Sequence, residues 1–328
     1  MNSKAIMALK DCAWCRQVIE ADNKKGSDQV DQDMIELNTE SEEVNFPIRT
    51  LSAKTGVNSV TLRAWERRYG LLKPQRTEKG HRLYSEEDVA RVDAIVRWVQ
   101  QGVAVSKVRA LLDREESAEN VTPATEWIEW QASLINLSRQ FNEDKIEHLY
   151  QQIFSQYPPL VAFKNWILPS LEQLTVGVHA RFCNAVLSRC LAGRLASLKN
   201  QHVNAPKVLI TGLYGERTLW CYMASALFSD QGFACCVLPN MSSGQDWQAL
   251  IEGLEPSALI AFCENELVPK STDLITALDA WGEPVALIGA SFWLAAHADD
   301  MTEIGSVKVY SEALEGVTAT LERLGGEE

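Results

Sequence analysis

The chain has 328 residues, of which 46% are hydrophobic and 23% charged, so its composition is that of an ordinary globular protein and excludes a fibrous or wholly disordered one. No run approaches the about twenty apolar residues that span a bilayer, and no apolar signal segment opens the chain, so we expect a cytoplasmic protein. The net charge of −13 would exclude nucleic acid as a partner only if it were spread evenly.

The charge is unevenly distributed. Residues 46–112 hold thirteen Lys and Arg against six Asp and Glu, whereas residues 1–45 hold five against ten and residues 113–328 hold thirteen against twenty-eight. One basic module therefore lies within an acidic chain. Acidic surroundings would repel a DNA duplex from the rest of the surface and so orient its docking on the basic module.

Residues 1–45 are predicted to form a disordered acidic arm, because few large apolar residues occur there. Cys12 and Cys15 form a CxxC pair, which could be half of a zinc site or a redox pair. A structural zinc ion needs four ligands, and the sequence has no second CxxC and no HxxxH pair. We therefore interpret both as free thiols and predict no metal site. The eight cysteines of so long a chain, without a secretion signal, do not predict a disulfide framework.

A helix-turn-helix is predicted next. A short helix ends near Thr55, and Gly56 supplies a turn residue that tolerates positive φ. Asn58 or Ser59 is well placed to cap the following helix. On that second helix, the apolar residues fall on one face: Leu62, Trp65 and Tyr69. Basic residues occupy the opposite face and its flank, together with one hydroxyl: Arg63, Arg67, Thr61 and Arg68.

A basic wing follows this helix. Pro74 and Gly80 break the chain, and two short extended segments joined by a turn would form a hairpin there. Its basic residues are Lys73, Arg76, Lys79, His81 and Arg82. A helix that offers Arg donors to base edges, beside a wing that holds phosphates, is what recognition of duplex DNA requires. A merely solvated cationic surface is the alternative.

These residues carry a family resemblance. The stretches TLRAWERRYGLLKPQR (61–76) and GHRLYSEEDV (80–89) resemble the winged helix-turn-helix of the MerR family. The likeness is to the branch of the light-sensing cobalamin repressors and the MlrA-type activators of curli and extracellular-matrix genes. It implies a DNA-binding domain over residues 46–115. The implied DNA-contacting residues are Thr61, Arg63, Arg67, Arg68, Arg76, Lys79, His81, Arg82 and Tyr84.

The same resemblance implies the partners. Double-stranded promoter DNA would be bound by a homodimer or higher homo-oligomer on symmetric half-sites. RNA polymerase is a possible second partner, and matrix or biofilm genes would be among the targets.

A further helix of the head is predicted from Ser85, because Ser85 with Asp88 has the pattern of a capping box. Valines at three- and four-residue spacing would pack it on the helix-turn-helix: Val89, Val92, Val96 and Val99. Gly102 ends this helix, and Ser106 caps a short one after it. The acidic segment 113–123 is the first linker.

Residues 124–202 read as a bundle of four helices with short loops. The first two apolar stripes comprise Trp127, Trp130, Leu134, Leu137 and Phe141, then Ile146, Leu149, Ile153 and Phe154. We expect a third helix around Trp166, broken near Pro169, and a fourth over Ala180–Lys199.

Residues 205–328 change to alternating strands and helices, which indicates a doubly wound, Rossmann-like parallel sheet. The predicted strands are Lys207–Leu213, Phe233–Leu238, Ala258–Cys263, Val285–Gly289 and Val307–Tyr310. The predicted helices are Arg217–Asp230, Asp246–Leu254, Ser271–Trp281 and Ser311–Leu324. A binding crevice, if there is one, lies beyond the carboxyl ends of the strands.

A bundle and such a sheet behind a MerR-type head resemble the cobalamin-binding module of the light-sensing repressors. In that family an Asp-x-His-x-x-Gly loop follows the first strand, and its His ligates cobalt. The corresponding positions here are Glu216, Thr218 and Cys221, and the bundle positions over the corrin fall on His179, Arg189 and Cys190. A threonine hydroxyl is a poor cobalt ligand beside a neutral imidazole. The resemblance thus implies a degenerate cobalamin-binding-like domain, and we predict no cofactor.

Other chemistry finds little support. His179 or His202 could ligate a metal ion from another direction, but a lone His is more often a surface residue or a hydrogen-bonded core residue than a ligand. No glycine-rich phosphate motif follows the first strand, and no nucleophile and base stand at a recognisable spacing, so we predict no enzyme. The leading hypothesis is a DNA-binding transcriptional regulator whose C-terminal half is regulatory or oligomerising without cobalamin. The alternative is a regulator whose C-terminal half senses a small, cobalamin-like molecule.

Overall fold

The computed structural model describes residues 45–112, 125–199, 204–213, 217–241, 247–264, 271–298 and 303–325. Cys12 and Cys15 of the expected arm lie outside the described residues, as do His202 and Glu216. Among the residues described, no helix is both long and apolar enough to cross a membrane.

The head comprises β1 (Phe46–Pro47), α2 (Ile48–Thr55), α3 (Ser59–Ala64), the π-helical turn η2 (Trp65–Tyr69), β2 (Gln75–Arg76), β3 (Arg82–Tyr84), α4 (Glu86–Gln100) and α5 (Val105–Leu112). Its strands pair antiparallel in the order β1-β3-β2, with Phe46 opposite Tyr84 and Arg76 opposite Arg82. The predicted wing is therefore the β2–β3 hairpin, to which β1 adds a strand that the sequence did not indicate.

Helix α4 packs its valine face against the core of the head. At its start the Ser85 backbone N–H donates to Asp88 Oδ2 (3.1 Å), which stabilises the first turn. Val92 and Val99 are fully buried, and Val89 and Val96 are partly buried against the same core. The predicted spacing of the valines is thus the spacing of the buried face.

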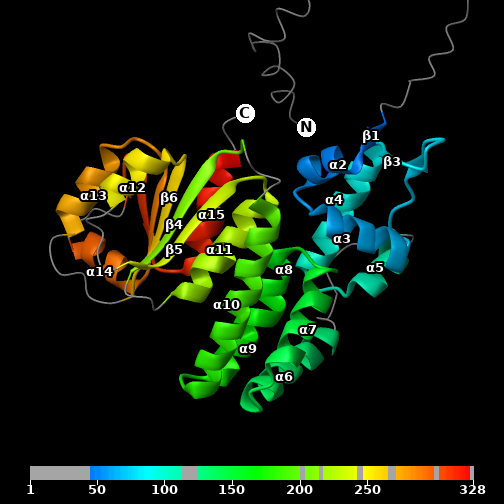
Figure 1. Ribbon diagram of the computed structural model, residues 1–328, viewed down its shortest axis with the longest axis horizontal. Coiled ribbons are helices and arrows are strands. Elements are labelled where there is room, and N and C mark those ends of the chain that lie inside the picture. Colours follow the sequence, from blue (N-terminus) through cyan, green and yellow to red (C-terminus); the bar gives the residue numbers. More distant parts are fainter. Residues whose placement is uncertain are drawn as a thin grey trace, which may run out of the picture. The chain divides into compact units, whose positions relative to one another are not determined.

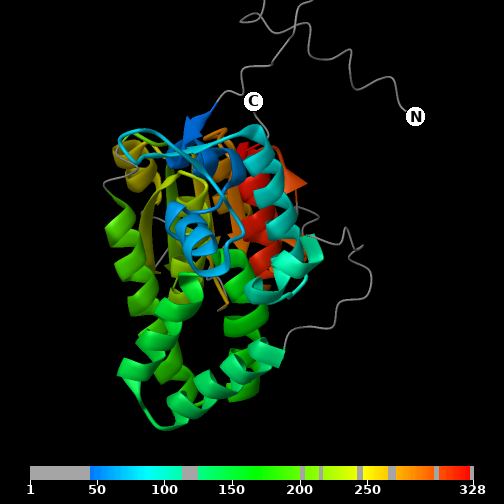
Figure 2. The ribbon, with the colours of Figure 1, turned by 90° about the vertical axis from the view of Figure 1, so that its right-hand side faces the viewer.

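The bundle comprises α6 (Thr125–Arg139), α7 (Glu143–Phe154), α8 (Pro159–Ala162), the π-helical turn η4 (Phe163–Ile167), α9 (Leu168–Leu174) and α10 (Val178–Leu198). These helices run side by side in both ribbon views (Figures 1 and 2). The expected break near Pro169 is wrong. The chain stays helical from residue 159 to residue 174, and Pro169 is the second residue of α9, directly after the π-helical turn η4.

The C-terminal domain comprises β4 (Lys207–Leu213), α11 (Thr218–Asp230), β5 (Ala234–Met241), α12 (Trp247–Leu254), β6 (Ala258–Phe262), α13 (Ser271–Asp279), β7 (Val285–Ile288), α14 (Ala290–Ala298), β8 (Glu303–Ile304), β9 (Val307–Tyr310) and α15 (Ala313–Gly325). The strand order is β5-β4-β6-β7-β9-β8. All neighbours are parallel except β8, a two-residue antiparallel strand at the edge. The predicted strands are confirmed, and α14 and β8 are additional.

Helices cover both faces of this sheet. Alternate residues of β4 point to opposite sides: Val208 and Ile210 belong to one core and Leu209 to the other. Helices α11 and α15 pack on the first side, and α12, α13 and α14 on the second (Figure 1). The first core is continuous with the apolar interior of the bundle and the head.

Candidate nucleic-acid interface

The helix-turn-helix forms for the local reasons that the sequence gives. Gly56 ends α2 in the left-handed region (φ 65°), which a residue with a Cβ adopts at a cost. The Asn58 side chain caps α3 by accepting a hydrogen bond from the Val60 N–H at 2.9 Å. Helix α3 then runs into the π-helical turn η2, which ends at Gly70, again left-handed. Together α3 and η2 make the recognition helix, residues 59–69.

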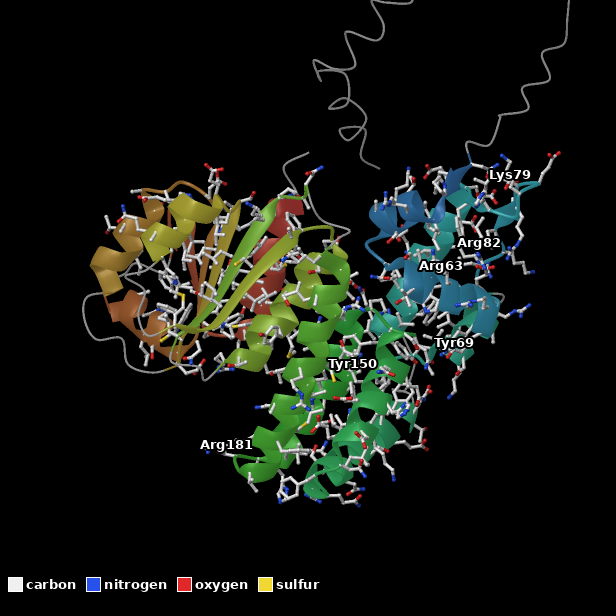
Figure 3. The ribbon with its side chains drawn as sticks, viewed as in Figure 1. Arg63, Tyr69, Lys79, Arg82, Tyr150 and Arg181 are labelled. Atoms are coloured by element: carbon white, nitrogen blue, oxygen red, sulfur yellow. The ribbon has the colours of Figure 1, made fainter. Side chains whose placement is uncertain are left out.

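The recognition helix has an apolar back and a basic front. Leu62 and Trp65 are fully buried, and Tyr69 is half-buried against the same core. On the front, Arg63 is partly exposed, and Arg67 is exposed. Figure 3 labels Arg63 on this helix, and Arg82 and Lys79 on the wing.

Glu66 holds the wing to the recognition helix. Its side chain, only 12% exposed, accepts a hydrogen bond from Arg82 Nε at 2.5 Å and another from Arg76 Nη2 at 3.2 Å. The hydrogen bond that Arg82 donates to Glu66 raises the pKa of Arg82 above its usual value, so this guanidinium stays charged. At the tip, the Thr77 N–H donates to the His81 carbonyl at 2.9 Å and closes the hairpin.

The structure divides the nine predicted DNA-contacting residues. Five are exposed, namely Arg67, Arg68, Arg76, Lys79 and His81, and two are partly exposed, namely Arg63 and Arg82. Two are in the core of the head: Thr61 is 2% exposed and Tyr84 is fully buried, and burial raises the pKa of Tyr84 to about 12. The expectation that Thr61 and Tyr84 contact DNA is corrected by this burial, since neither side chain reaches the surface.

The back of the recognition helix is hydrogen-bonded to the bundle. Trp65 Nε1 donates to the backbone carbonyl of Gln156 at 2.8 Å, and the Tyr69 hydroxyl donates to the side-chain oxygen of Gln156. Burial raises the pKa of Tyr69, which keeps that hydroxyl protonated at neutral pH. Arg68 Nη1 reaches Ser155 Oγ at 3.4 Å, so Arg68 lies toward the bundle as well as at the surface.

A second set of hydrogen bonds joins the turn between α4 and α5 to the bundle. The Val105 N–H donates to the Tyr157 hydroxyl at 3.1 Å, and Trp127 Nε1 donates to the Gly102 carbonyl at 3.1 Å. The Tyr157 ring also packs against the Trp127 ring, with the two centroids 4.5 Å apart and the planes tilted by 57°. Buried hydrogen bonds of this kind are costly to leave unmade. Residues 155–157 therefore tie the bundle to two separate parts of the head.

A crevice lies at the carboxyl edge of the parallel sheet. It has a volume of about 940 Å³ and is lined by α10, by the start of α11 and by Glu264, which follows β6. Strands β4 and β6 are neighbours here and their connections leave in opposite directions, which is the usual position of a ligand in such sheets. An ion pair between Arg217 and Glu264 lies in this crevice.

Comparison with known proteins decides the family. The family described as "MerR HTH family regulatory protein" matches residues 46–115. The HTH-type transcriptional regulator MlrA of Escherichia coli (strain K12) is 30% identical over 249 residues, which are 74% of this chain and 98% of that protein. This chain is a MerR-family transcriptional regulator of the MlrA type. The HTH-type transcriptional repressor CarH of Myxococcus xanthus is 28% identical over 171 residues, 48% of this chain and 56% of that protein.

The MerR resemblance seen in the sequence is thereby confirmed, and these relatives are regulators of transcription. A solved structure, the methanol:cobalamin methyltransferase complex MtaBC from Methanosarcina barkeri, is similar with a TM-score of 0.33 and 14% identity, over 65% of this chain and 84% of that one. So distant a likeness carries no inference about a ligand.

The residues of this MerR-family chain do not fit the cobalt ligation that the resemblance to the light-sensing repressors implies. Thr218 begins α11 where the resemblance places a His, and among the described residues no imidazole lines the crevice. His179 lies instead against the Phe141 ring, 4.9 Å between centroids. Arg189 is held by Glu143 and Glu147. Nor do the described residues hold any cluster of three or more His, Cys, Asp or Glu that could bind a metal ion.

Burial favours the thiol form of the two cysteines at the family's positions. Cys221 is fully buried, and burial raises the pKa of its thiol to about 12. Cys190 is partly buried, and burial raises its pKa to about 11. Both remain protonated thiols at neutral pH, whereas a thiolate is the form that binds metals and attacks electrophiles.

Sequence reasoning missed Glu66, Gln156 and Tyr157. Glu66 gave a signal, since it is the one acidic residue on a helix expected to face phosphates, where an unpaired carboxylate would repel DNA. Gln156 and Tyr157 gave none, because their partners lie in the head, far away in the sequence.

Proposed function

We propose that this regulator binds specific promoter DNA through the recognition helix and the wing. We also propose that the bundle holds the recognition helix in position through hydrogen bonds to its buried face. The supporting observation is the surface itself. Arg63 and Arg67 lie on the front of a capped helix, and Arg76, Lys79 and His81 lie on a wing that Glu66 fastens to that helix. Arg63 and Arg67 serve base edges, and the wing serves phosphates.

The protein binds as a dimer or higher homo-oligomer on an inverted repeat. Two recognition helices would then meet half-sites one helical turn apart, or a multiple of it, about 34 Å for one turn. The MlrA-type kinship supports genes of the extracellular matrix or of biofilms as targets and RNA polymerase as a second partner, in the bacterial cytoplasm. The crevice and the bundle serve regulation or assembly.

Genome-wide footprinting of the bound protein tests this function. It should yield a small set of promoter sites that share an inverted repeat. Binding to one such site should exceed binding to random duplex by at least about a thousandfold at physiological salt. Affinity that is the same for the footprinted site and random duplex, across a range of salt concentrations, would refute the proposal.

The second candidate function is ligand sensing, favoured by the 940 Å³ crevice at the sheet's carboxyl edge. Cobalamin is not the ligand that these residues favour, because Thr218 supplies no imidazole. We expect protein incubated with cobalamin and then desalted to be colourless. A coloured complex of defined stoichiometry would restore the sensing function of the cobalamin relatives.

A further inference from the structure

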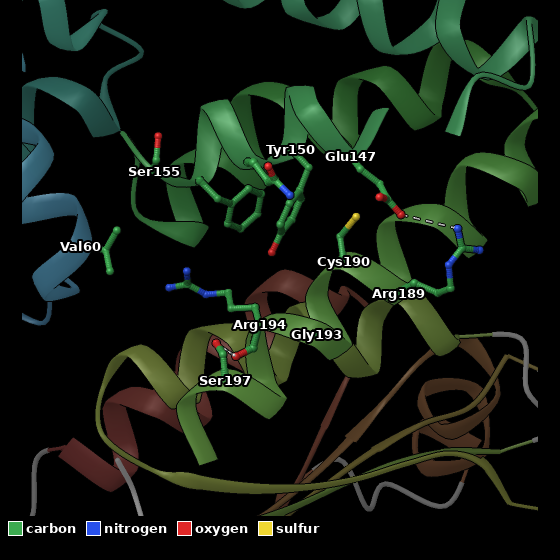
Figure 4. Close-up of a pocket in the computed structure, with 11 residues that line it drawn as sticks. Val60, Glu147, Tyr150, Ser155, Arg189, Cys190, Gly193, Arg194 and Ser197 are labelled. Carbon is green, nitrogen blue, oxygen red and sulfur yellow. Dashed lines mark hydrogen bonds and ion pairs between the residues drawn. The ribbon is translucent and has the colours of Figure 1, made fainter. Parts of the chain in front are cut away.

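We propose that a groove between α7 and α10 is a binding site for a small organic carboxylate with an apolar body, held by the Tyr150 hydroxyl and the Arg194 guanidinium. The groove has a volume of about 460 Å³ and lies on the bundle, apart from the crevice of the sheet (Figure 4). Arg189 is the one residue that lines both.

The walls of the groove are aromatic on one side and open on the other. Tyr150 and Phe154 of α7 stack at 4.2 Å with their planes 25° apart. Facing them on α10 is Gly193, where an added Cβ would meet nothing within 4 Å. The groove therefore has an apolar wall for a ligand's body, and an empty space that a side chain at position 193 would fill.

Two polar atoms in this groove lack partners. The Tyr150 hydroxyl has no hydrogen-bond partner although Tyr150 is only 7% exposed, and Arg194 Nε has none either. A buried donor without a partner destabilises the fold. Burial raises the pKa of Tyr150, so the hydroxyl remains a donor at every physiological pH. In Figure 4 this hydroxyl points across the groove toward α10.

The groove offers guanidinium and hydroxyl donors to an anionic group. The residues lining it include Arg189 and Arg194 against Glu147, while Glu143 and Asp230, which pair with these two arginines, are not among the lining residues. Glu147 lies 3.8 Å from Arg189, which Glu143 also holds, at the rim. Arg194 Nη2 donates to Asp230 at 2.5 Å, which fixes the guanidinium in place, while its Nε–H is buried without a partner. One carboxylate has two oxygens, and these match one O–H and one N–H donor.

A ligand in the groove would contact residues next to the DNA-binding surface. Val60, in the first turn of the recognition helix, is 54% exposed and lines the same groove. Ser155, which accepts from Arg68, lines it too. This step rests on the proposed function, because it assumes that residues 59–69 read DNA. Binding of the carboxylate itself does not depend on that assumption.

The test measures binding of acetate, benzoate and 3-phenylpropionate to the full chain by calorimetry and by saturation-transfer NMR. Benzyl alcohol is the neutral probe, and inorganic phosphate is a second anion. We expect saturable binding of benzoate or 3-phenylpropionate, tighter than that of acetate. Tyr150→Phe and Gly193→Leu should each weaken it at least tenfold. Tyr222→Phe, a matched change in the crevice of the sheet, should leave it unchanged.

Stability separates a site from a merely structural tyrosine. Because the hydroxyl is unpaired, Tyr150→Phe should melt at the same temperature as the parent or higher, while losing the ligand. No saturable binding by any of the three carboxylates, or binding that both variants retain, would overturn the proposal. Equal binding of benzyl alcohol would overturn the anionic assignment. A bound carboxylate that leaves promoter affinity unchanged would refute the coupling alone.

Discussion

Replacing Glu66 by Gln tests how the wing is fastened to the recognition helix. The change removes the charge that Arg82 and Arg76 share, at a side chain only 12% exposed. A hydrogen bond to a charged group contributes about 1.5–3 kcal/mol. Most of this free energy should come from the contact with Arg82, whose side chain is 25% exposed. The contact with Arg76 should contribute little, because the Arg76 side chain is 53% exposed. We expect the wing to lose about 1–2 kcal/mol of local stability.

Hydrogen exchange of residues 75–84 measures this loss directly. The Thr77 amide donates to the His81 carbonyl, so its exchange reports opening of the hairpin. In the EX2 limit a loss of about 1–2 kcal/mol accelerates exchange about 5- to 30-fold. DNA affinity should fall on all sequences together, because loosened phosphate donors carry no sequence information.

Glu78→Gln is the matched control, since Glu78 is an exposed acid of the same wing for which no ion pair is seen in the described residues. It should leave exchange of residues 75–84 unchanged. If Glu66→Gln accelerates exchange less than twofold, or no more than Glu78→Gln does, Glu66 does not fasten the wing.

Two further predictions concern buried aromatic residues of the head. Trp65→Phe should destabilise the contact with the bundle by about 1–3 kcal/mol, because the Gln156 carbonyl loses its buried donor, and exchange of amides around residues 155–157 should quicken. Tyr84→Phe should keep DNA affinity within about twofold and be as stable as the parent or more so at neutral pH, because the Tyr84 hydroxyl is buried without a partner. Burial raises the pKa of Tyr84 to about 12 in the folded protein, against about 10 in the unfolded chain, so between these values unfolding releases the hydroxyl proton. The free energy of unfolding of the parent therefore keeps its full value below about pH 10 and falls as the pH rises toward about 12. Tyr84→Phe has no such proton to lose and should resist alkaline unfolding in that window better than the parent.

Local signals in the sequence predicted most elements, because they depend on neighbouring residues. Gly56, Asn58 and the valines of α4 each act within a few positions of the chain, and each behaves as expected. Strand β5 continues past the predicted end through Pro239, which is tolerated because β5 is an edge strand of the sheet. Helix α14 is apolar almost throughout and so shows no helical period in its sequence.

The parts of the candidate site that escaped prediction depend on tertiary contacts. Tyr84 stands among basic residues in the sequence, yet it pairs with Phe46 across β1 and β3 and is buried. The Trp65 ring was expected to pack inward, but its hydrogen bond to residue 156 joins positions 91 residues apart. Groups paired over such distances leave no pattern in a single sequence.

Base-pair preference of two arginine variants tests the central claim most directly. Affinities for the footprinted site, for single-base variants of it and for random duplex would be measured for Arg63→Ala, Arg76→Ala and the control Arg139→Ala, an exposed arginine of the bundle. Arg63→Ala should lose about 1–3 kcal/mol on the preferred site, about 5- to 150-fold, and relax its preference at one position. Arg76→Ala should weaken all duplexes alike and lower the salt slope by about 1, and Arg139→Ala should do neither. Equal loss on every duplex for both Arg63→Ala and Arg76→Ala would contradict the account.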